Sequence, residues 1–194
     1  MHRFMYGLAR FMAILGGLVL SAIIVLVCIS VIGRRLNTLL HTDWVQGILG
    51  NGAQWLLDTG IGPILGDFEL VEAGTAFAIF AFIPLCQITG GHATVDIFTS
   101  QMSDRVNRTI QVVVEIAFAI VLVVIAWKLY DGMQAKMRYN ETTFLLQFPV
   151  WWSYLASLIP AIVGAVVGIY MAVVRIGESV TGRTLLKVGG EVDH

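Results

Sequence analysis

The sequence is short of charged residues, prolines and cysteines. Of its 194 residues 13% are charged and 57% are hydrophobic, whereas an average soluble domain carries about 25% charged residues. The formal net charge is −1, which excludes the broad basic field typical of nucleic-acid binding. These shortages exclude an ordinary soluble domain. They indicate one integral-membrane domain over residues 1–194, surrounded by the lipid bilayer.

Catalytic and metal-binding motifs are also lacking. The two cysteines, Cys28 and Cys86, lie inside apolar runs, which favours buried small side chains over a disulfide. None of the four histidines falls in the middle of an apolar run, which disfavours a haem held between helices. No Ser–His–Asp arrangement, phosphate-binding loop or cysteine pair is present. We therefore expect no catalytic residue, no metal and no cofactor, and a protein that is not an enzyme.

Long apolar runs are what the sequence has instead. Crossing a bilayer takes about 20 mostly apolar residues, and inside lipid the backbone must satisfy its own hydrogen bonds, which favours helices. The first run follows MHRFMYGLAR and is too long for the core of a signal peptide, so we interpret it as an uncleaved transmembrane helix. The prediction is an all-α membrane protein with four transmembrane helices, at about 11–32, 70–89, 109–130 and 150–174.

The connection between the first two spans, about 34–69, is unusually long. It is too polar and too often interrupted by glycine to span the membrane, yet too apolar for a solvated loop. Trp44 and Trp55 are residues of the type that anchors segments at a membrane surface. We therefore predict a long first loop that carries one or two short interfacial helices; a loop that packs only on the protein is the alternative.

The distribution of lysine and arginine predicts the orientation, because basic residues concentrate on the cytoplasmic side. With both termini inside, the cytoplasmic segments hold seven of these residues and the outer segments five. This excess favours cytoplasmic termini. The inner set is Arg3, Arg10, Arg105, Arg108, Arg175, Arg183 and Lys187; the outer set is Arg34, Arg35, Lys128, Lys136 and Arg138.

Three acids lie within or beside the spans, where charge is costly and marks function or a partner. Glu69 and Glu72 are three residues apart, so they share a helix face and can pair with Arg34, Arg35 or Lys128. Glu115 lies in the third span with Gln111 on the same face, within reach of an inner arginine such as Arg108 or Arg10. We interpret these as structural or subunit-interface charges; an ion-carrying role for Glu115 is the alternative.

Two short glycine-containing patterns complete the candidates. Residues 89–96, TGGHATVD, fit the exit of the second span into a cytoplasmic turn, with His92 and Asp96 shaping the turn or meeting a partner. Two such side chains are too few for a metal site. In the fourth span, Gly164 and Gly168 form the small-residue spacing that lets helices approach closely in lipid.

Taken together, the order of these motifs resembles the small membrane subunit, the DctQ or Q subunit, of tripartite ATP-independent periplasmic (TRAP) transporters. The resemblance covers Arg10 to Arg175 and is carried by GDFELVEAGTAFAIFAF, TGGHATVDIF and LLQFPVWWSYLASLIP. The matching positions are Glu72 at the start of the second span, then Gly91, His92, Val95 and Asp96, then Pro149, Trp151 and, one position off strict spacing, Trp152 with Tyr154.

This resemblance implies a bacterial inner-membrane protein and two partner proteins. A periplasmic substrate-binding protein captures a small organic acid, and a large membrane subunit on a separate chain moves it inward, driven by an ion gradient. The small subunit braces the large one. The alternative from another class is a self-sufficient, homo-oligomeric small carrier or channel that uses Glu115.

Overall fold

The computed structural model describes residues 1–42, 44, 45, 47, 52, 55, 60, 62–90 and 104–181, and it is built from helices. They are α1 (His2–Leu40), α4 (Asp67–Thr89), α6 (Asp104–Arg138) and α7 (Trp151–Thr181). All four are long and apolar enough to cross a membrane. The predicted class, an all-helical protein with four membrane-spanning helices, is therefore confirmed within this part of the chain.

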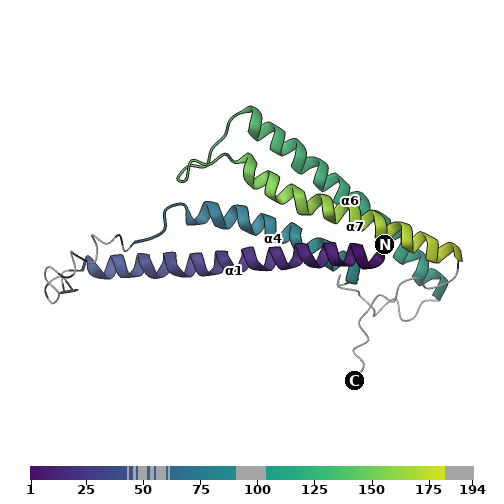
Figure 1. Cartoon of the computed structure of the whole chain (residues 1–194), viewed down its shortest axis with the longest axis horizontal. Helices are drawn as coiled ribbons and strands as arrows, with labels where there is room; N and C mark the ends of the chain where they lie inside the picture. Colours follow the sequence, from purple (N-terminus) through teal and green to yellow (C-terminus); the bar gives the residue numbers. More distant parts are fainter. Residues whose placement is uncertain are drawn as a thin grey trace, which may run out of the picture.

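The helices pack side by side in the order α1, α4, α7, α6, which differs from their order along the chain. Figure 1 shows α1 lying along α4, and α7 lying along α6, as two pairs that diverge towards one end of the molecule. Because α4 and α7 are the inner helices, each has neighbours on two sides. Among the four, α7 is the most buried, which fits its central position.

The tightest core lies at the end where the two helix pairs meet. It is formed by Ala9, Ile88, Val167 and Met171, from α1, α4 and α7. The ring of His2 also stacks on that of Tyr170, with 6.3 Å between the ring centroids. The beginning of α1, the end of α4 and the second half of α7 are therefore joined here, and the cavities described below lie towards the other end.

Glycines set both ends of α4. Gly66 precedes the helix with φ of 77°, and Gly90 follows it with φ of 63°, a left-handed backbone that glycine adopts without steric cost. Asp67 and Glu69 occupy the first turn, where negative charge interacts favourably with the helix dipole. The predicted end of the second span at Gly90 is thus confirmed, and Pro84 within the helix does not break it.

The helices are longer than the predicted spans, because charged residues end the lipid-embedded part of a helix without ending the helix. At Gly33-Arg34-Arg35, where the predicted first span ends, the helix does not stop, since α1 continues to Leu40, and arginine is itself a good helix former. At about 1.5 Å per residue, the 39 residues of α1 extend about 58 Å. This exceeds the 40–45 Å or so of a bilayer with its headgroups, so α1 is tilted or projects beyond the membrane.

The expected long first loop with short interfacial helices is not supported. Of residues 34–69, the first seven belong to α1 and the last three to α4, and half of the others lie outside the described residues. Trp44 and Trp55 are exposed. A backbone segment does return along α1, because a side chain added at Gly33 would meet the carbonyl oxygen of Gly62.

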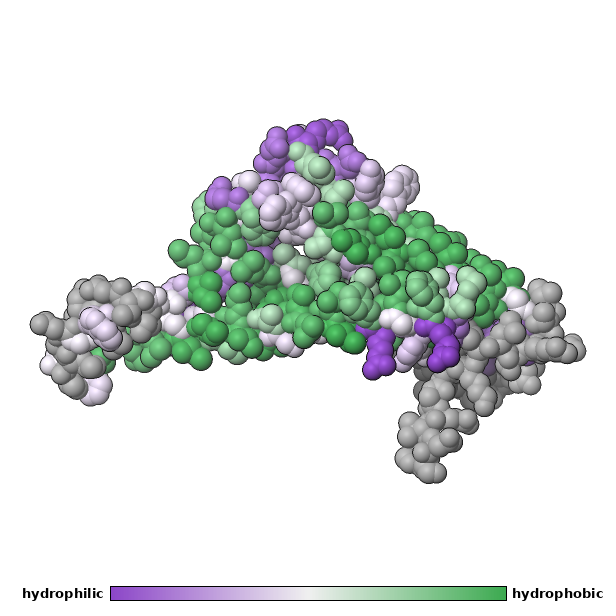
Figure 2. Space-filling view, viewed as in Figure 1, coloured by the Kyte–Doolittle hydropathy of each residue, from purple (hydrophilic) through white to green (hydrophobic). Residues whose placement is uncertain are grey.

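Hydrophobic residues cover most of the helical surface in view, as Figure 2 shows, and hydrophilic residues gather where α6 ends. Many exposed large side chains on α1 and α6 are aliphatic, among them Ile24, Val25, Val113 and Ile120. In water such a surface would aggregate. Within a bilayer it is the expected lipid- or protein-facing surface.

The close approach of α1 to α4 at Gly16 gives a testable prediction. A methyl group added at Gly16 would lie 2.9 Å from Cβ of Ala81 and 3.4 Å from the carbonyl oxygen of Ala78, whereas one at Gly17 meets nothing within 4 Å. We expect Gly16→Leu to lower the stability of the purified chain in detergent by about 1–3 kcal/mol through overpacking. Thermal unfolding followed by circular dichroism measures this.

The matched control is Gly17→Leu, which places the same side chain one residue further on, in open space. It should unfold at the wild-type temperature. Equal losses in the two variants would show that helix propensity, and not the α1–α4 contact, accounts for the effect.

Candidate functional site

The clearest site lies at the diverging end of the helices, where a short hairpin, residues 139–150, joins α6 to α7. Its two arms pair through Thr143 N–H to the Phe148 carbonyl at 2.9 Å and Val150 N–H to the Glu141 carbonyl at 2.9 Å. The left-handed residues Asn140 and Gln147 turn the chain within it. The hairpin is therefore an ordered element that reaches from α6 and α7 towards the start of α4.

Glu69 holds this hairpin on α4. Its side chain is buried, and its two carboxylate oxygens accept hydrogen bonds from the backbone N–H groups of Leu145 at 2.7 Å and Leu146 at 3.0 Å. The Leu146 side chain lies against Gly66, where a Cβ atom would collide with it. The predicted pairing of Glu69 with a basic residue is therefore wrong, because backbone amides satisfy the carboxylate.

Asp67, which the sequence analysis did not single out, links α4 to α1. It accepts a hydrogen bond from the hydroxyl of Ser30 at 2.6 Å and lies 3.5 Å from Nη2 of Arg34. The Ser30 hydroxyl in turn accepts the backbone N–H of Ile64 at 3.2 Å. Arg34 thus pairs with Asp67 instead of Glu69 or Glu72, while Arg35 is exposed and forms no ion pair within the described residues.

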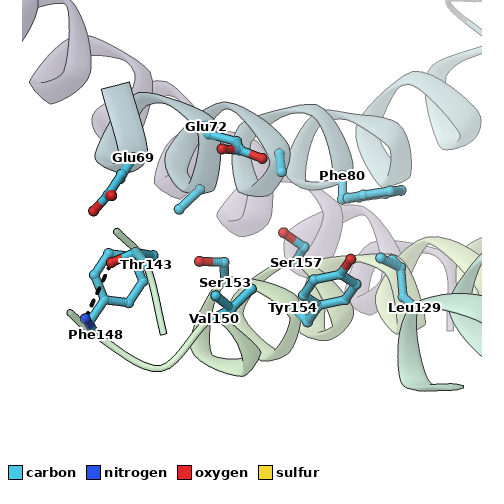
Figure 3. A pocket seen from close by; sticks show the side chains of 12 residues that line it. Glu69, Glu72, Phe80, Leu129, Thr143, Phe148, Val150, Ser153, Tyr154 and Ser157 are labelled. Atoms are coloured by element: carbon cyan, nitrogen blue, oxygen red, sulfur yellow. Dashed lines mark hydrogen bonds between the residues drawn. The ribbon is translucent and has the colours of Figure 1, made fainter. Parts of the chain in front are cut away.

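Between α4, α7 and the hairpin lies a cavity of about 370 Å³. Most of the wall's surface is apolar, although two acids and several hydroxyl groups also line it. In Figure 3, Glu69 and Glu72 project from α4, and the hydroxyls of Ser153 and Ser157 point towards α4 from the opposite side. The lining residues are Glu69, Glu72, Ala73, Ala76, Phe80, Leu129, Thr143, Phe148, Val150, Ser153, Tyr154 and Ser157.

The two acids of the cavity differ in their partners. Glu69 is fully used by the hairpin, whereas Glu72, one turn later, is exposed and has no hydrogen bond or ion pair with the described residues. The predicted pairing of Glu72 with Arg34, Arg35 or Lys128 is not found; Lys128 lies 3.8 Å from Asp131. A carboxylate on a largely apolar wall without a counter-ion is the most unusual charge in this region.

A second polar cluster joins the other ends of α4, α6 and α7. Gln87, which is 1% exposed, donates its side-chain N–H to Glu115 at 2.5 Å, linking α4 to α6. On α7, Arg175 forms a buried ion pair with Glu178 at 2.8 Å, and its positive charge also acts on Glu115. The inner arginine whose charge acts on Glu115 is thus Arg175, a member of the predicted inner set other than the named examples Arg108 and Arg10.

The two glycines of the fourth span face different helices. A side chain at Gly164 would meet Ile83 and Pro84 of α4 at ordinary contact distances, whereas one at Gly168 would lie 3.0 Å from Leu122 of α6. The prediction that this face packs closely on other helices agrees with both contacts. The small residues do not form one interface, because α7 lies between α4 and α6.

His92 and Asp96 lie outside the described residues, so the structure does not test the predicted turn. Within the described part of the chain, no group of three or more histidine, cysteine or acidic side chains is placed to hold a metal ion. Four residues of the polar clusters were not predicted from the sequence: Ser30, Asp67, Gln87 and Glu178. Gln87 could have been identified, since it is a lone amide near the end of an apolar span.

The different roles of Glu69 and Glu72 predict different effects on the isolated chain. Glu69→Ala removes the acceptors of two backbone N–H groups, and each buried, unpaired N–H costs about 1–3 kcal/mol. We expect a clear fall in thermal stability and faster proteolysis within residues 139–150. Glu72→Ala serves as the matched control and should change neither. If both variants behave like the wild type, the carboxylate does not hold the hairpin.

Comparison with known proteins agrees with these observations. No curated protein and no solved structure matched the chain. The family model described as "Tripartite ATP-independent periplasmic transporters, DctQ component" matches residues 23–180, which include α4, α6 and the hairpin, most of α7, and α1 from Ile23 onwards. This family is a transporter component and not an enzyme family. The chain therefore belongs to the DctQ family, the small membrane component of TRAP transporters.

Proposed function

We propose that this DctQ component is a scaffold that braces the large membrane subunit of a TRAP transporter during ion-gradient-driven uptake of an organic acid delivered by a periplasmic binding protein. The observation that supports this most is that polar side chains of the helices bond to other elements of the same chain. Glu69, Asp67 and Glu115 each bond to another element of the same chain. They stabilise the arrangement of the helices, which is what a rigid brace requires.

The arrangement of the helices also supports a bracing role. The outer helices, α1 and α6, carry broad apolar surfaces that no other part of the described chain covers. Together with the divergence of the two helix pairs (Figure 1), these surfaces offer the large subunit an extended area of contact in the membrane. A scaffold of this shape widens the fixed part of the transporter against which a substrate-carrying domain moves.

The self-sufficient carrier remains the second candidate, and Glu115 is the residue on which it depends. Its carboxylate binds Gln87 from the neighbouring helix, and the Arg175 charge acts on it. An ion-carrying acid needs to exchange its partner during transport. A carboxylate that is bonded to a buried amide, with the charge of an arginine nearby, fits a structural contact better, and this favours the scaffold.

For the location, we propose the bacterial inner membrane with both termini in the cytoplasm. Membership of this family supports a location in the membrane that faces the periplasm. The beginning of α1 and the end of α7 lie at the same end of the helices (Figure 1), as an even number of crossings requires. The excess of basic residues that the sequence gives to the cytoplasmic segments, seven against five, supports the orientation.

Transport assays of the chain with and without its partners test the proposal. In liposomes with an ion gradient, the chain alone should take up no organic acid, whereas the complex with the large subunit and the binding protein should do so. The reason is that Asp67, Glu69 and Glu115 are engaged in structural bonds within the chain. Saturable uptake by the chain alone would overturn the scaffold assignment, and so would the absence of any complex with the large subunit.

Substitution of Glu115 separates the two candidates further. Glu115→Gln keeps an oxygen that accepts the Gln87 hydrogen bond, so uptake by the complex should keep its dependence on sodium and on pH. Glu115→Leu removes the acceptor and should lower stability by about 1.5–3 kcal/mol, the range for hydrogen bonds to charged groups. Uptake rates are measured against ion concentration and normalised to the amount of complex. A shifted ion half-saturation in Glu115→Gln, with normal assembly, would assign Glu115 to transport.

A further inference from the structure

Glu72 is a negative charge for which the described residues provide no counter-ion. It lines the cavity between α4, α7 and the hairpin and has no bond to the described residues. Three cations on this side of the molecule pair with other acids: Arg34 lies 3.5 Å from Asp67, Lys128 lies 3.8 Å from Asp131, and Lys136 binds Glu141. Arg35 and Arg138 form no ion pair within the described residues, and neither lines the cavity. A carboxylate beside hydrocarbon is costly unless a positive group pairs with it.

A second observation points to the same cavity. Ser157 is 2% exposed, and its hydroxyl has no hydrogen-bond partner. A serine hydroxyl within a helix can bond back to a carbonyl of its own helix, as Ser21 does to the Gly17 carbonyl at 2.8 Å, but Ser157 does not. Figure 3 shows it pointing across the cavity towards α4. A buried polar group without a partner is costly, so a ligand with N–H groups would satisfy it.

The lining of the cavity favours a ligand that carries positive charge and no negative charge. The lining residues include two acids and four hydroxyl-bearing side chains of α7 and the hairpin, but no lysine or arginine among the described residues. The phosphate of a phospholipid headgroup would therefore meet carboxylates without a cation to balance it. A lysine or arginine side chain carries positive charge alone, and its methylene groups pack well on apolar walls such as Phe80 and Leu129.

We propose that this cavity receives a lysine or arginine side chain of the large membrane subunit, with Glu72 as its counter-ion and Ser157 as a hydrogen-bond acceptor. The inference rests on the proposed scaffold function, which supplies the partner chain. In this proposal Glu72 makes the subunit contact. Glu69 does not, because its carboxylate already accepts hydrogen bonds from the hairpin. The hairpin that Glu69 holds in place forms one wall of the receiving cavity.

The first experiment measures assembly after charge changes. This chain and the large subunit are expressed together, and the amount of large subunit that co-purifies is normalised to this chain. Glu72→Lys should lower it by about tenfold or more, because truncating or inverting a desolvated charge pair weakens an interface by at least that factor, and Glu72→Gln should lower it less. The control is Asp131→Asn, since Asp131 is exposed and its nearest cation is Lys128 on the same helix.

The second experiment identifies what occupies the cavity. The photoreactive residue p-benzoylphenylalanine replaces Tyr154, whose ring lines the cavity, in the full complex in native membranes. Irradiation should join this chain to the large subunit, and mass spectrometry should place the attachment beside a lysine or arginine. Adding Glu72→Gln should reduce the yield of this product. Reversing the charge of the identified residue should restore assembly with Glu72→Lys.

The outcomes separate this inference from the scaffold proposal. If the large subunit co-purifies equally well with every Glu72 variant, or if irradiation yields only phospholipid adducts or none, the inference is wrong while the scaffold proposal stands. If the wild-type chain forms no complex at all, both are wrong. Thermal unfolding of each variant in isolation checks that a loss of assembly does not arise from misfolding.

Discussion

Close approach of helix backbones is the constraint on which this structure depends. Lipid tails are as apolar as leucine side chains, so helices in a membrane associate through close packing and a few polar links instead of the hydrophobic effect. Small residues provide that packing on both inner helices: Gly16 of α1 lies against Ala81 of α4, and Gly168 of α7 lies against Ala119 of α6. The position of α7 between α4 and α6 follows from small residues on adjoining faces.

Polar links then fix how the packed helices are placed, and they form two groups at opposite ends. At one end, the Asp67 and Glu69 carboxylates connect α4 to α1 and to the hairpin. At the other, Gln87 connects α4 to Glu115 of α6. Because α4 takes part in both groups, it serves as the central connection of the molecule. The cavity beside Glu72 lies at the end where the helix pairs diverge, which leaves it accessible to another chain.

Several features followed from the sequence because they depend on local chemistry alone. The apolar runs determined the number and type of the helices, since only a helix of that length can satisfy its backbone in lipid. Gly90 ended the second span for the same local reason, its tolerance of a left-handed backbone. The order of the motifs also indicated the family that residues 23–180 match. The full helix lengths were not predicted, because hydropathy reports where lipid begins and not where a helix stops.

The partners of the acids were decided by the tertiary structure. Glu69 and Glu72 look equivalent in the sequence, three residues apart on one helix face. The hairpin folds back over the first and leaves the second open, so one is satisfied by backbone amides and the other is not. Likewise, Gln87 and Glu115 are 28 residues apart and meet only because α4 and α6 both border α7. The sequence by itself determined which groups carry charge in the membrane. The packing order of the helices determined which of these groups remain available to a partner, because that order sets which groups come within bonding distance.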